Sequence, residues 1–397
     1  MADNWISESE RFAPTLRVIR LERGADAKLI KAARKKADLV VLNYTQLRLL
    51  ESEINAAPWH AAILDEAQAI KNPQSLTAVA ACSLTAPHRL ALSGTPIENR
   101  LLDLWSIMNF ARPGVLGNRS AFQKLYDSKT DPLARRRLSA RVRPFVLRRT
   151  KGEVARDLPD KIEEDLHCEL EGVQSTLYKA ELKRARKALL GLSSGKELDK
   201  ARFHILSSLL RLRQICCHPG LVVPDSAGES CKLNALIELL EPLMEEGHKV
   251  LIFSQFVEML SLIRTELEAR DWPHFILTGQ TENRGSLVHD FQTAEGAAVF
   301  LISLRAGGFG LNLTAASYVV LFDPWWNPAV ENQAIDRTHR IGQTQKVIAY
   351  RLLVKETIEE KIRTLQQTKS TLAGDVLGEE SFARALTLDD FQFLFAE

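Results

Sequence analysis

Long apolar runs are missing from this chain of 397 residues. None approaches the roughly 20 consecutive apolar residues that span a bilayer, so we expect no transmembrane helix and no membrane partner. The first ten residues, M-A-D-N-W-I-S-E-S-E, are polar and acidic. A secretory signal needs an apolar stretch after a basic start, and a transit peptide is poor in acidic residues. These features predict a soluble intracellular protein.

Cysteine and net charge are also scarce. The five cysteines are odd in number and irregularly spaced, which does not describe a disulfide framework and fits a reducing compartment. The 52 basic and 50 acidic residues leave a net charge of only +2. The chain as a whole therefore does not attract nucleic acid, and any basic binding surface must be local.

The sequence contains no phosphate-binding loop of the form G-x₄-G-K-[ST]. The nearest stretch is S-S-G-K at residues 193–196. There Gly191 lies too close to Gly195, and Glu197 stands where a hydroxyl is required. This stretch lies between two predicted helices, whereas a phosphate-binding loop must follow a strand. We therefore reject this stretch as a nucleotide-binding loop.

The first hundred residues predict an alternation of helices and strands. A chain of this length is too long for one ordinary core, so we expect two or more domains. Residues 1–38 are charged and predict helix. Strands are expected at Asp38–Tyr44, Ala61–Leu64 and Arg89–Leu92, separated by helical segments. This pattern indicates a parallel α/β sheet with functional loops at the carboxyl ends of its strands.

The middle of the chain predicts helices. A helical pattern runs from Leu101 to about Asp165, and two amphipathic helices follow at Val173–Leu190 and Phe203–Ile215. A polar link at residues 191–200 joins these two helices. The run Arg135–Lys151 is strongly basic. It fits a surface that holds a phosphodiester backbone and, equally well, a solvated charged face.

From Cys231 onward the alternation is cleaner and predicts a second parallel sheet of about five strands. Gly247 suits the position just after a helix. The expected elements are helix Lys232–Glu246, strand Lys249–Phe253, helix Val257–Ala269, strand Phe275–Leu277, helix Arg284–Gln292, strand Ala298–Ile302, strand Tyr318–Phe322, strand Val347–Leu353 and a closing helix at about residues 357–371.

Two polar motifs end neighbouring strands of the first sheet. Asp65 and Glu66 follow A-A-I-L within D-E-A-Q. A carboxylate there can hold a magnesium ion through water, while its neighbour polarises an attacking water. A solvated acidic turn is the alternative for two carboxylates alone. Ser93-Gly94-Thr95 place two hydroxyls beside a glycine, or form a turn in which Pro96 starts the next helix.

The stretch from Glu331 to Gln343 carries two arginines and a glutamine at helical spacing. Arg337 and Arg340 are three residues apart, and Gln333 lies four residues before the first of them. If the segment is helical, all three point to one face. Two guanidinium forks and an amide on one face suit a polyphosphate.

Three further motifs have two interpretations each. The glycines of R-A-G-G-F-G at residues 305–310 allow close approach of a ligand backbone or phosphate, or serve only turn geometry. Cys216-Cys217-His218 lacks the C-x₂₋₄-C spacing of a zinc site. Buried cysteines at a helix end are the better interpretation. Trp325-Trp326 favours packing over contact with nucleic acid.

Taken together and in this order, these motifs resemble the Swi/Snf family of superfamily-two helicase-like ATPases, over residues 4–363. The resemblance implies two RecA-like parallel-sheet lobes with helical insertions, ATP bound between the lobes, and movement along double-stranded DNA. The matching stretches are D-E-A-Q from Asp65, L-S-G-T-P-I-E-N-R from Leu92, L-R-R-T-K from Leu147, L-R-Q-I-C-C-H-P from Leu212, K-V-L-I-F-S-Q-F from Lys249, R-A-G-G-F-G-L-N-L-T-A-A from Arg305, D-P-W-W-N-P from Asp323 and Q-A-I-D-R-T-H-R-I-G-Q from Gln333.

The resemblance implies a role for each matching residue. Asp65 and Glu66 correspond to the catalytic carboxylates, with Asp65 holding magnesium through water. Arg337 and Arg340 correspond to arginine fingers. The remaining implied roles are nucleotide binding by Gln333, Asp65 and Gly310, coupling of hydrolysis to movement by Gln68, Ser93, Gly94 and Thr95, and DNA binding by Ser254, Gln255, Arg305, Gly307, Gly308, Arg148 and Arg149.

The first lobe departs from the family. There, a glutamine-bearing adenine-binding element and a G-K-T phosphate loop precede these motifs, and neither occurs in the 397 residues. We expect an incomplete first lobe at residues 1–100, helical insertions at 101–230, a second lobe at 231–365 and a tail at 366–397.

By lineage we expect a Swi/Snf-type ATP-dependent translocase of double-stranded DNA that uses ATP with magnesium. In the chain as given we expect impaired hydrolysis and weak nucleotide binding. Two alternatives stay open: a non-hydrolysing DNA-binding or partner-docking fragment, and one half of a split motor completed by an N-terminal fragment. We expect a bacterial cytoplasmic location beside the nucleoid rather than a nuclear one.

Overall fold

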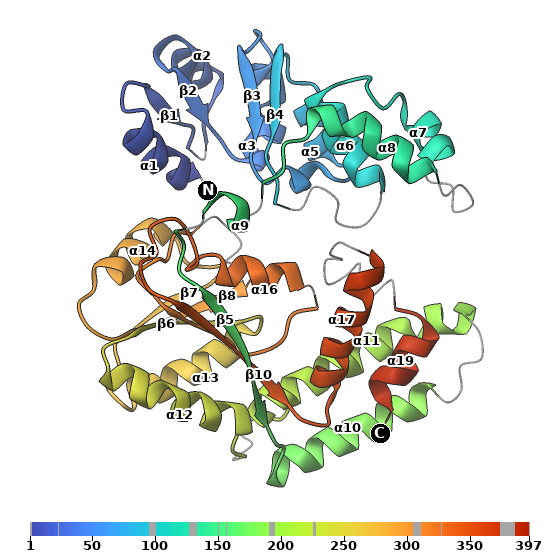
Figure 1. The fold of residues 1–397 in the computed structure, drawn as a ribbon, viewed down its shortest axis with the longest axis vertical. Helices are drawn as coiled ribbons and strands as arrows, with labels where there is room; N and C mark the ends of the chain where they lie inside the picture. The colour runs from blue at the N-terminus through green and yellow to red at the C-terminus, as the bar shows by residue number, and fades with distance from the viewer. Residues whose placement is uncertain are drawn as a thin grey trace. The chain divides into compact units, whose positions relative to one another are not determined.

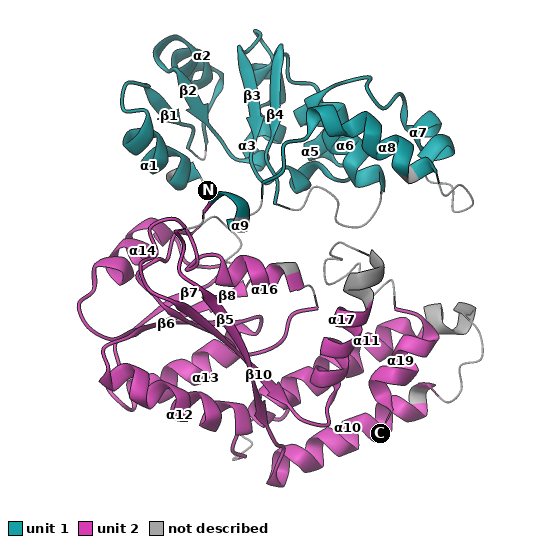
Figure 2. Cartoon of the chain, in the orientation of Figure 1, with its two compact units in different colours: residues 1–154 teal, residues 155–397 magenta. Residues whose placement is uncertain are grey.

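The computed structural model describes residues 2–22, 24–94, 101–126, 133–149, 151–155, 157–189, 195–224, 228–304, 311–326, 328–373 and 386–396. The chain divides into two compact units, Met1–Val154 and Ala155–Glu397 (Figure 2). The division falls inside the region that was expected to hold only helical insertions.

Unit 1 is the amino-terminal unit, and its described part alternates short strands with helices (Figure 1). Its elements are α1 (Ala2–Phe12), β1 (Val18–Arg20), α2 (Ala27–Lys36), β2 (Leu39–Val41), α3 (Tyr44–Leu49), α4 (Glu51–Ile54), β3 (Ala61–Leu64), the 3₁₀ turn η1 (Ala67–Ile70), α5 (Leu76–Cys82), β4 (His88–Ala91), α6 (Leu101–Ala111), α7 (Arg119–Tyr126), α8 (Ala134–Val142), the 3₁₀ turn η2 (Arg143–Phe145) and α9 (Lys151–Val154).

The four described strands of unit 1 form two separate parallel pairs. β1 pairs with β2, with Val18 opposite Leu39, and β3 pairs with β4, with Ala61 opposite His88. The expectation of one sheet containing all three predicted strands is therefore wrong for the described residues. β1 was missed because it has only three residues and lies in a charged region that favours helix.

The core of unit 1 lies on one side of these strands. Ala62 and Leu64 of β3 are buried against α2, α3 and α5, together with Ile30 and Ala78. The alternate residues face outward, and Ile63 is 45% exposed. α6, α7 and α8 form a second small core around Phe122. Because successive side chains of a strand point to opposite faces, the helices cover one face of the β3–β4 pair and leave the other accessible to solvent.

Unit 2 is built on a six-stranded parallel sheet in the order β5-β10-β9-β6-β8-β7. Its elements are β5 (Lys161–Cys168), α10 (Gly172–Leu189), α11 (Gly195–Cys217), the 3₁₀ turn η3 (Pro219–Leu221), α12 (Cys231–Glu245), β6 (Lys249–Ser254), α13 (Val257–Glu268), β7 (His274–Leu277), α14 (Arg284–Thr293), β8 (Ala298–Ser303), β9 (Tyr318–Leu321), α16 (Pro328–Ile335), β10 (Val347–Val354), α17 (Ile358–Ala373) and α19 (Leu388–Phe395).

The structure corrects two expectations about the middle of the chain. The region up to about Asp165 was predicted to be helical, yet Lys161–Cys168 forms an eight-residue edge strand paired along its whole length with β10. β5 lies at the edge of the sheet and faces solvent along much of its length. Its sequence, K-I-E-E-D-L-H-C, therefore contains few apolar residues. The polar link between α10 and α11 is also shorter than predicted, since α11 begins at Gly195.

Helices cover both faces of the sheet of unit 2 (Figure 1). On one face α12 and α13 bury Leu240 and Ile263 against Ile252 and Leu301. On the other, α14 and α16 bury Phe291 and Ile335 against neighbouring strand residues. The central strands are therefore apolar throughout, as is typical of parallel sheets enclosed on two sides.

A third core joins four helices of unit 2. α10, α11, α17 and α19 pack together around Leu209, Ile362 and Phe391. The carboxyl-terminal segment, to which no role was assigned from sequence, thus contributes α19 to this core.

Among the residues that the structure describes, no helix is both long and apolar enough to cross a membrane.

Candidate functional site: a carboxylate pair in unit 1 and an arginine segment in unit 2

The carboxylate pair lies at the carboxyl end of β3, as predicted. Asp65 accepts a hydrogen bond from the indole Nε1 of Trp5 at 2.9 Å and another from the backbone N–H of Glu66 at 2.9 Å. Glu66 has a φ of 48°, in the left-handed region. A non-glycine residue there costs about 1–2 kcal/mol. This strained turn holds both carboxylates just after the strand.

A line of side chains leads from this pair to the neighbouring strand. The Gln68 amide donates to Glu66 Oε2 at 2.6 Å, and Ser93 Oγ donates to Gln68 Oε1 at 2.8 Å. Ser93 and Gly94 follow β4, which pairs with β3. The structure therefore brings together Asp65, Glu66, Gln68 and Ser93, while Thr95 lies outside the described residues.

Tyr44 supports the turn from behind. Its hydroxyl donates to the backbone carbonyl of Asp65 at 2.8 Å. Burial, followed by the nearby Asp65 and Glu66 carboxylates, raises the pKa of the Tyr44 hydroxyl. Tyr44 therefore stays protonated and remains a donor.

The two arginines predicted as fingers lie just beyond a helix rather than on it. α16 ends at Ile335, and Arg337 and Arg340 follow in turns. The condition under which Arg337, Arg340 and Gln333 would share one helical face is therefore not met. The hydroxyl of Thr338 donates to the carbonyl of Ile335 at 2.7 Å, which offers the backbone a local alternative to continued helix.

Tertiary contacts fix these turns within unit 2. The carbonyl of Arg337 accepts from the N–H of Leu313 at 3.0 Å. The buried amide of Gln343 donates to the carbonyls of Ala316 at 2.9 Å and Thr314 at 3.1 Å. His339 contacts the carbonyl of Pro159 at 2.7 Å. Arg337 is mostly buried, whereas Gln333 and Arg340 are half-buried.

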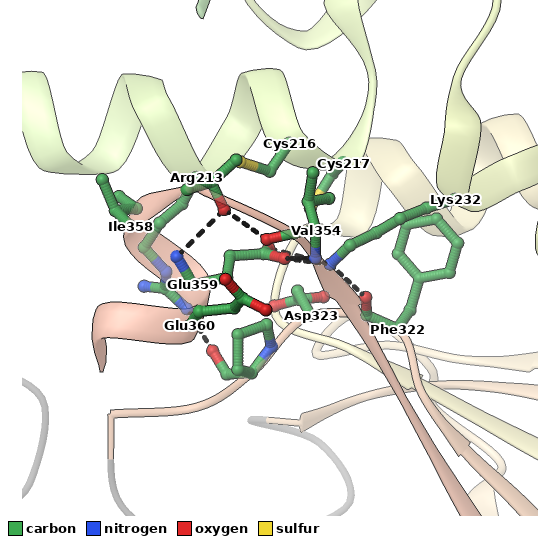
Figure 3. Close-up of polar contacts among 12 residues, drawn as sticks. Arg213, Cys216, Cys217, Lys232, Phe322, Asp323, Val354, Ile358, Glu359 and Glu360 are labelled. Atoms are coloured by element: carbon green, nitrogen blue, oxygen red, sulfur yellow. Dashed lines mark hydrogen bonds and ion pairs between the residues drawn. The ribbon is translucent and has the colours of Figure 1, made fainter. Parts of the chain in front are cut away.

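The connector between β9 and α16, residues 322–326, is held through its backbone by buried side chains. Lys232 Nζ donates to the carbonyl of Phe322 at 2.9 Å, and Arg213 Nη2 donates to the carbonyl of Pro324 at 2.6 Å. Figure 3 shows both cations converging on this stretch. Arg213 also lies 5.1 Å from the Trp326 ring centroid, within cation–π range.

The second half of the connector is held from α16 and α17. The N–H of Trp325 donates to Glu331 Oε1 at 2.8 Å, and the Gln366 amide donates to the Trp325 carbonyl. Trp325 and Trp326 are nearly buried, which confirms the prediction that they pack. Because the connector leads directly into α16, these contacts determine where Gln333 lies.

A fully buried ion pair underlies the connector. Lys232 Nζ lies 2.8 Å from Glu359 Oε1, and both side chains are 0% exposed. The other carboxylate oxygen of Glu359 accepts from the N–H of Val354 at 3.0 Å. Burial lowers the pKa of Lys232, but the Glu359 carboxylate and neighbouring thiols raise it by more. Burial raises the pKa of Glu359, and Lys232 opposes this rise.

A second charged cluster joins β10 to β5 and α16. Arg351 is 4% exposed, and its Nε donates to Glu331 Oε2 at 3.0 Å. Its other nitrogens contact Asp165 and, at 3.4 Å, Glu163 on β5. Burial lowers the pKa of Arg351, and these carboxylates raise it by more. The edge strand is thus tied to the arginine segment through one guanidinium group.

Ser254 does not lie where a DNA-contacting residue would be accessible. It is 0% exposed, and its hydroxyl donates to Asp323. The Asp323 carboxylate also accepts from the N–H of Gln255 at 3.2 Å, and burial raises its pKa. The structure therefore gives Ser254 a role in shaping the loop after β6. The buried Nε2 of Gln255 has no hydrogen-bond partner among the described residues.

The remaining DNA-binding predictions have two outcomes. Arg148 and Arg149 are exposed in an irregular stretch after η2 and are therefore accessible. Arg305, Gly307, Gly308 and Gly310 lie outside the described residues.

In the part of the chain that the structure describes, no group of three or more His, Cys, Asp or Glu side chains could hold a metal ion. Cys216 and Cys217 lie at the end of α11 and are completely buried.

Sequence reasoning missed the residues that hold the site together. Trp5, Lys232 and Glu359 were in none of the matching motifs, and Arg213 lies in the motif L-R-Q-I-C-C-H-P but was given no role. Arg351 did give a signal, because it is a single charge inside the apolar strand V-I-A-Y-R-L-L-V. A charge at such a position must be paired when it is buried.

Comparison with known proteins agrees with this arrangement. The family model for the SNF2-related domain matches residues 1–221, and that for the helicase conserved C-terminal domain matches residues 231–342. An uncharacterized ATP-dependent helicase of Mycoplasma pneumoniae is 37% identical over 399 residues, covering 99% of this chain and 38% of the relative. The human SWI/SNF-related matrix-associated actin-dependent regulator of chromatin subfamily A member 1 is 34% identical, covering 94% of this chain and 37% of the relative.

A solved structure is also similar. The Sulfolobus solfataricus SWI2/SNF2 ATPase core in complex with dsDNA is 35% identical with a TM-score of 0.51, covering 99% of this chain and 83% of that one. This chain thus spans about two fifths of the two relatives above and most of an ATPase core. The chain belongs to the SNF2-related, or Swi/Snf, family of helicase-like ATPases.

Proposed function

We propose that this chain supplies the water-activating carboxylates and the arginine fingers of an ATP-dependent motor that moves along double-stranded DNA. Family membership supports the proposal, as does the similar core that was solved with dsDNA. A bacterial cytoplasmic location beside the nucleoid is part of the same proposal.

The observation that carries this proposal is the line Glu66–Gln68–Ser93. It connects a candidate base at the end of β3 with the end of β4 through hydrogen bonds of 2.6 and 2.8 Å. A change in the charge or position of Glu66 is transmitted along such a line because Gln68 uses one end of its amide for each neighbour. This suits a motor, in which hydrolysis must alter the position of a neighbouring loop.

The donor set at β3 suits magnesium. Asp65 offers an ionised carboxylate with about four acceptor sites, and the contacts described above use two of them. A hydrated magnesium ion is commonly bound through one or two carboxylates together with substrate phosphates. Asp65 would hold the ion through water, and Glu66 would orient and polarise the attacking water. Bound ATP would supply the phosphoryl group.

Unit 2 would supply positive charge and DNA contacts. Arg337 and Arg340 would stabilise the charge that develops on the transferred phosphoryl group, and Gln333 would contact the nucleotide. The exposed Arg148 and Arg149 of unit 1 suit a phosphodiester backbone, as would the glycine loop at 305–310.

The 397 residues contain no G-x₄-G-K-[ST] loop, and we propose that this chain alone hydrolyses ATP slowly. An arginine finger accelerates hydrolysis by about 10³–10⁵-fold only for a positioned nucleotide. Phosphate release from radiolabelled ATP, with duplex DNA and magnesium, tests this. We expect rates near background for the chain and for Glu66→Gln. Robust turnover that Glu66→Gln abolishes, and that the half-buried control Glu53→Gln retains, would contradict slow hydrolysis and support Glu66 as the base.

A second candidate function is favoured by the outer face of unit 1. Ile63 and Leu90 lie on the outward side of β3 and β4 and are 45% and 52% exposed. Such a face suits docking of a complementing fragment, as in a split motor. Recovery of ATP turnover when a complementing fragment is added, and loss of that recovery in Ile63→Asp, would favour this split-motor role.

A further inference from the structure

The carboxyl-terminal helix α19 is held on unit 2 through both its side chains and its backbone. Phe391 is completely buried in the core that α19 shares with α10, α11 and α17. Arg186 Nε on α10 donates to the carbonyl of Phe395 at 2.5 Å, and Lys361 Nζ on α17 donates to the carbonyl of Ala396 at 2.7 Å. The end of α19 is therefore fixed to two other helices.

The two tryptophans of the connector enter two different hydrophobic cores. Trp326 belongs to the helical core that contains Phe391 of α19. Trp325 belongs to the core between the sheet and its covering helices, together with Ala334 and Ile335 of α16. Consecutive Cα atoms are held about 3.8 Å apart by the peptide bond. The connector therefore joins the core of α19 to the core of α16 without a flexible link between them.

Two buried side chains hold the connector from the helical core. The amide of Gln366 on α17 donates to the carbonyl of Trp325, and Gln366 is 3% exposed. Arg213 Nη2 on α11 donates to the carbonyl of Pro324 at 2.6 Å, and its guanidinium group lies near the Trp326 ring. Both side chains contact main-chain carbonyls, so they determine the position of the chain that follows.

The chain that follows the connector carries the predicted nucleotide-contacting residues. α16 begins at Pro328 and carries Gln333, and Arg337 follows it in a turn. Glu331 Oε1 accepts from the N–H of Trp325 at 2.8 Å, which ties the helix to the connector. Packed cores have discrete arrangements and transmit small shifts through rigid elements. A displacement of the connector is therefore passed to α16 and to the arginine after it.

We propose that α19 sets the position of the arginine segment, residues 331–343, and that Gln366 and Arg213 are the positioning residues between them. A shift of α19 moves α17 and Trp326 through their shared core, and Gln366 passes the shift to the backbone of the connector. A partner that displaces α19 would thus change the position of Arg337. The inference rests on the proposed function only in taking Arg337 as an arginine finger.

The first test is hydrogen exchange of the full chain without nucleotide, which compares peptides of residues 328–343 with peptides of β6 and β8. Gln366→Met removes the donor to the Trp325 carbonyl. We expect exchange at 328–343 to rise about 10-fold while β6 and β8 stay unchanged. Gln367→Met is the matched control, because Gln367 is the next residue of α17 and is exposed. Modification of the mostly buried Arg337 by phenylglyoxal should also become faster in Gln366→Met and not in the control.

The second test changes α19 itself. Phe391→Leu keeps an apolar side chain but leaves part of its contact with the helical core unfilled. We expect exchange at 328–343 to rise by about 2–30-fold, the usual range for coupling between separate sites. Phe393→Leu is the control on the same helix, because Phe393 is 40% exposed. In the variant that combines Phe391→Leu with Gln366→Met, the rise should be smaller than the product of the two single effects.

The proposal is overturned if Phe391→Leu raises exchange only in α17 and α19, or raises it equally in β6 and β8. It is also overturned if Gln366→Met behaves like Gln367→Met, or if the two single effects multiply in the combined variant. None of these measurements involves ATP or DNA. A failure here is therefore distinct from a failure of the proposed motor function, which the phosphate-release assay tests.

Discussion

Replacement of Lys232 by methionine removes one half of the buried ion pair while keeping an unbranched side chain of similar length. Glu359 then remains 0% exposed without its countercharge, although it keeps the hydrogen bond from the N–H of Val354. The carbonyl of Phe322 also loses its donor. We expect a large loss of stability confined to unit 2.

The magnitude follows from the cost of an uncompensated buried charge. Breaking a buried pair by removing one partner typically costs about 3–5 kcal/mol. Lys249→Met is the matched control, since among the described residues Lys249 Nζ donates to the carbonyls of Phe291 and Gln292 and to no carboxylate. Its loss of hydrogen bonds should cost about 1–2 kcal/mol. Lys232→Met combined with Glu359→Gln should recover part of the loss, because no buried charge remains and the introduced amide oxygen can still accept from the N–H of Val354.

The loss should also depend on pH. Burial raises the folded-state pKa of Glu359 above the ordinary value of 4.5, and Lys232 opposes this rise. A group with a raised folded pKa contributes stability that is present below its unfolded pKa and lost as pH rises through the folded pKa. Without Lys232 the folded pKa of Glu359 rises further. The penalty of Lys232→Met is therefore smaller at pH 5 than at pH 8.

Native-state hydrogen exchange measured on peptides of β6 and β8 reports the stability of unit 2. A loss of 3–5 kcal/mol corresponds to an increase of about 10²-fold to several 10³-fold in the opening equilibrium. The reasoning is refuted if Lys232→Met weakens protection no more than Lys249→Met does. An equal penalty at both pH values, after correction for intrinsic exchange, would also refute it.

Three further predictions concern other contacts. Arg351→Met leaves Glu331 buried without its guanidinium partner and should destabilise unit 2 by about 3–5 kcal/mol in urea unfolding; a change below about 1 kcal/mol would argue against it. The Arg17 guanidinium lowers the pKa of exposed Asp38, and the backbone N–H of Arg17 lowers it further. This contribution to stability is present above the ordinary pKa value of 3.8 and is lost as pH falls. Arg17→Ala should therefore raise the NMR-detected pKa of Asp38 but leave it below 3.8, because the backbone N–H of residue 17 still donates to the carboxylate; an unchanged pKa would contradict this. Limited proteolysis should cleave unit 1 before unit 2, because unit 1 has two small sheets with an outward apolar face; cleavage of unit 2 first would contradict the ranking.

The sheet of unit 2 was largely predictable because its central strands are apolar runs bounded by turn residues. The predicted strands at 249–253 and 298–302 match β6 and β8 within one residue. Gly247, with a φ of 79°, follows α12 as expected. β5 was not predictable in this way, since an edge strand with charged residues has no apolar run, and its pairing with β10 is a contact between distant parts of the chain.

The candidate site was predictable only where a short motif carried it. Asp65 and Glu66 were placed correctly at a strand end, and their link through Gln68 to Ser93 agrees with the motif order. The end of α16 before Arg337 was not predictable, because the competing contacts come from Leu313 and from the Thr338 hydroxyl. The Lys232–Glu359 pair joins residues 127 positions apart, and no local pattern reports it.

Duplex DNA binding by the 397-residue chain, measured across a series of salt concentrations, tests the central claim most directly. We expect binding whose logarithmic affinity falls linearly with the logarithm of salt concentration, with a slope of about −0.9 for each phosphate contacted. Arg148→Ala with Arg149→Ala should reduce the slope by about two, whereas Arg264→Ala on α13 should not. Absence of duplex binding at low salt, or binding that the double substitution leaves unchanged, would contradict this account.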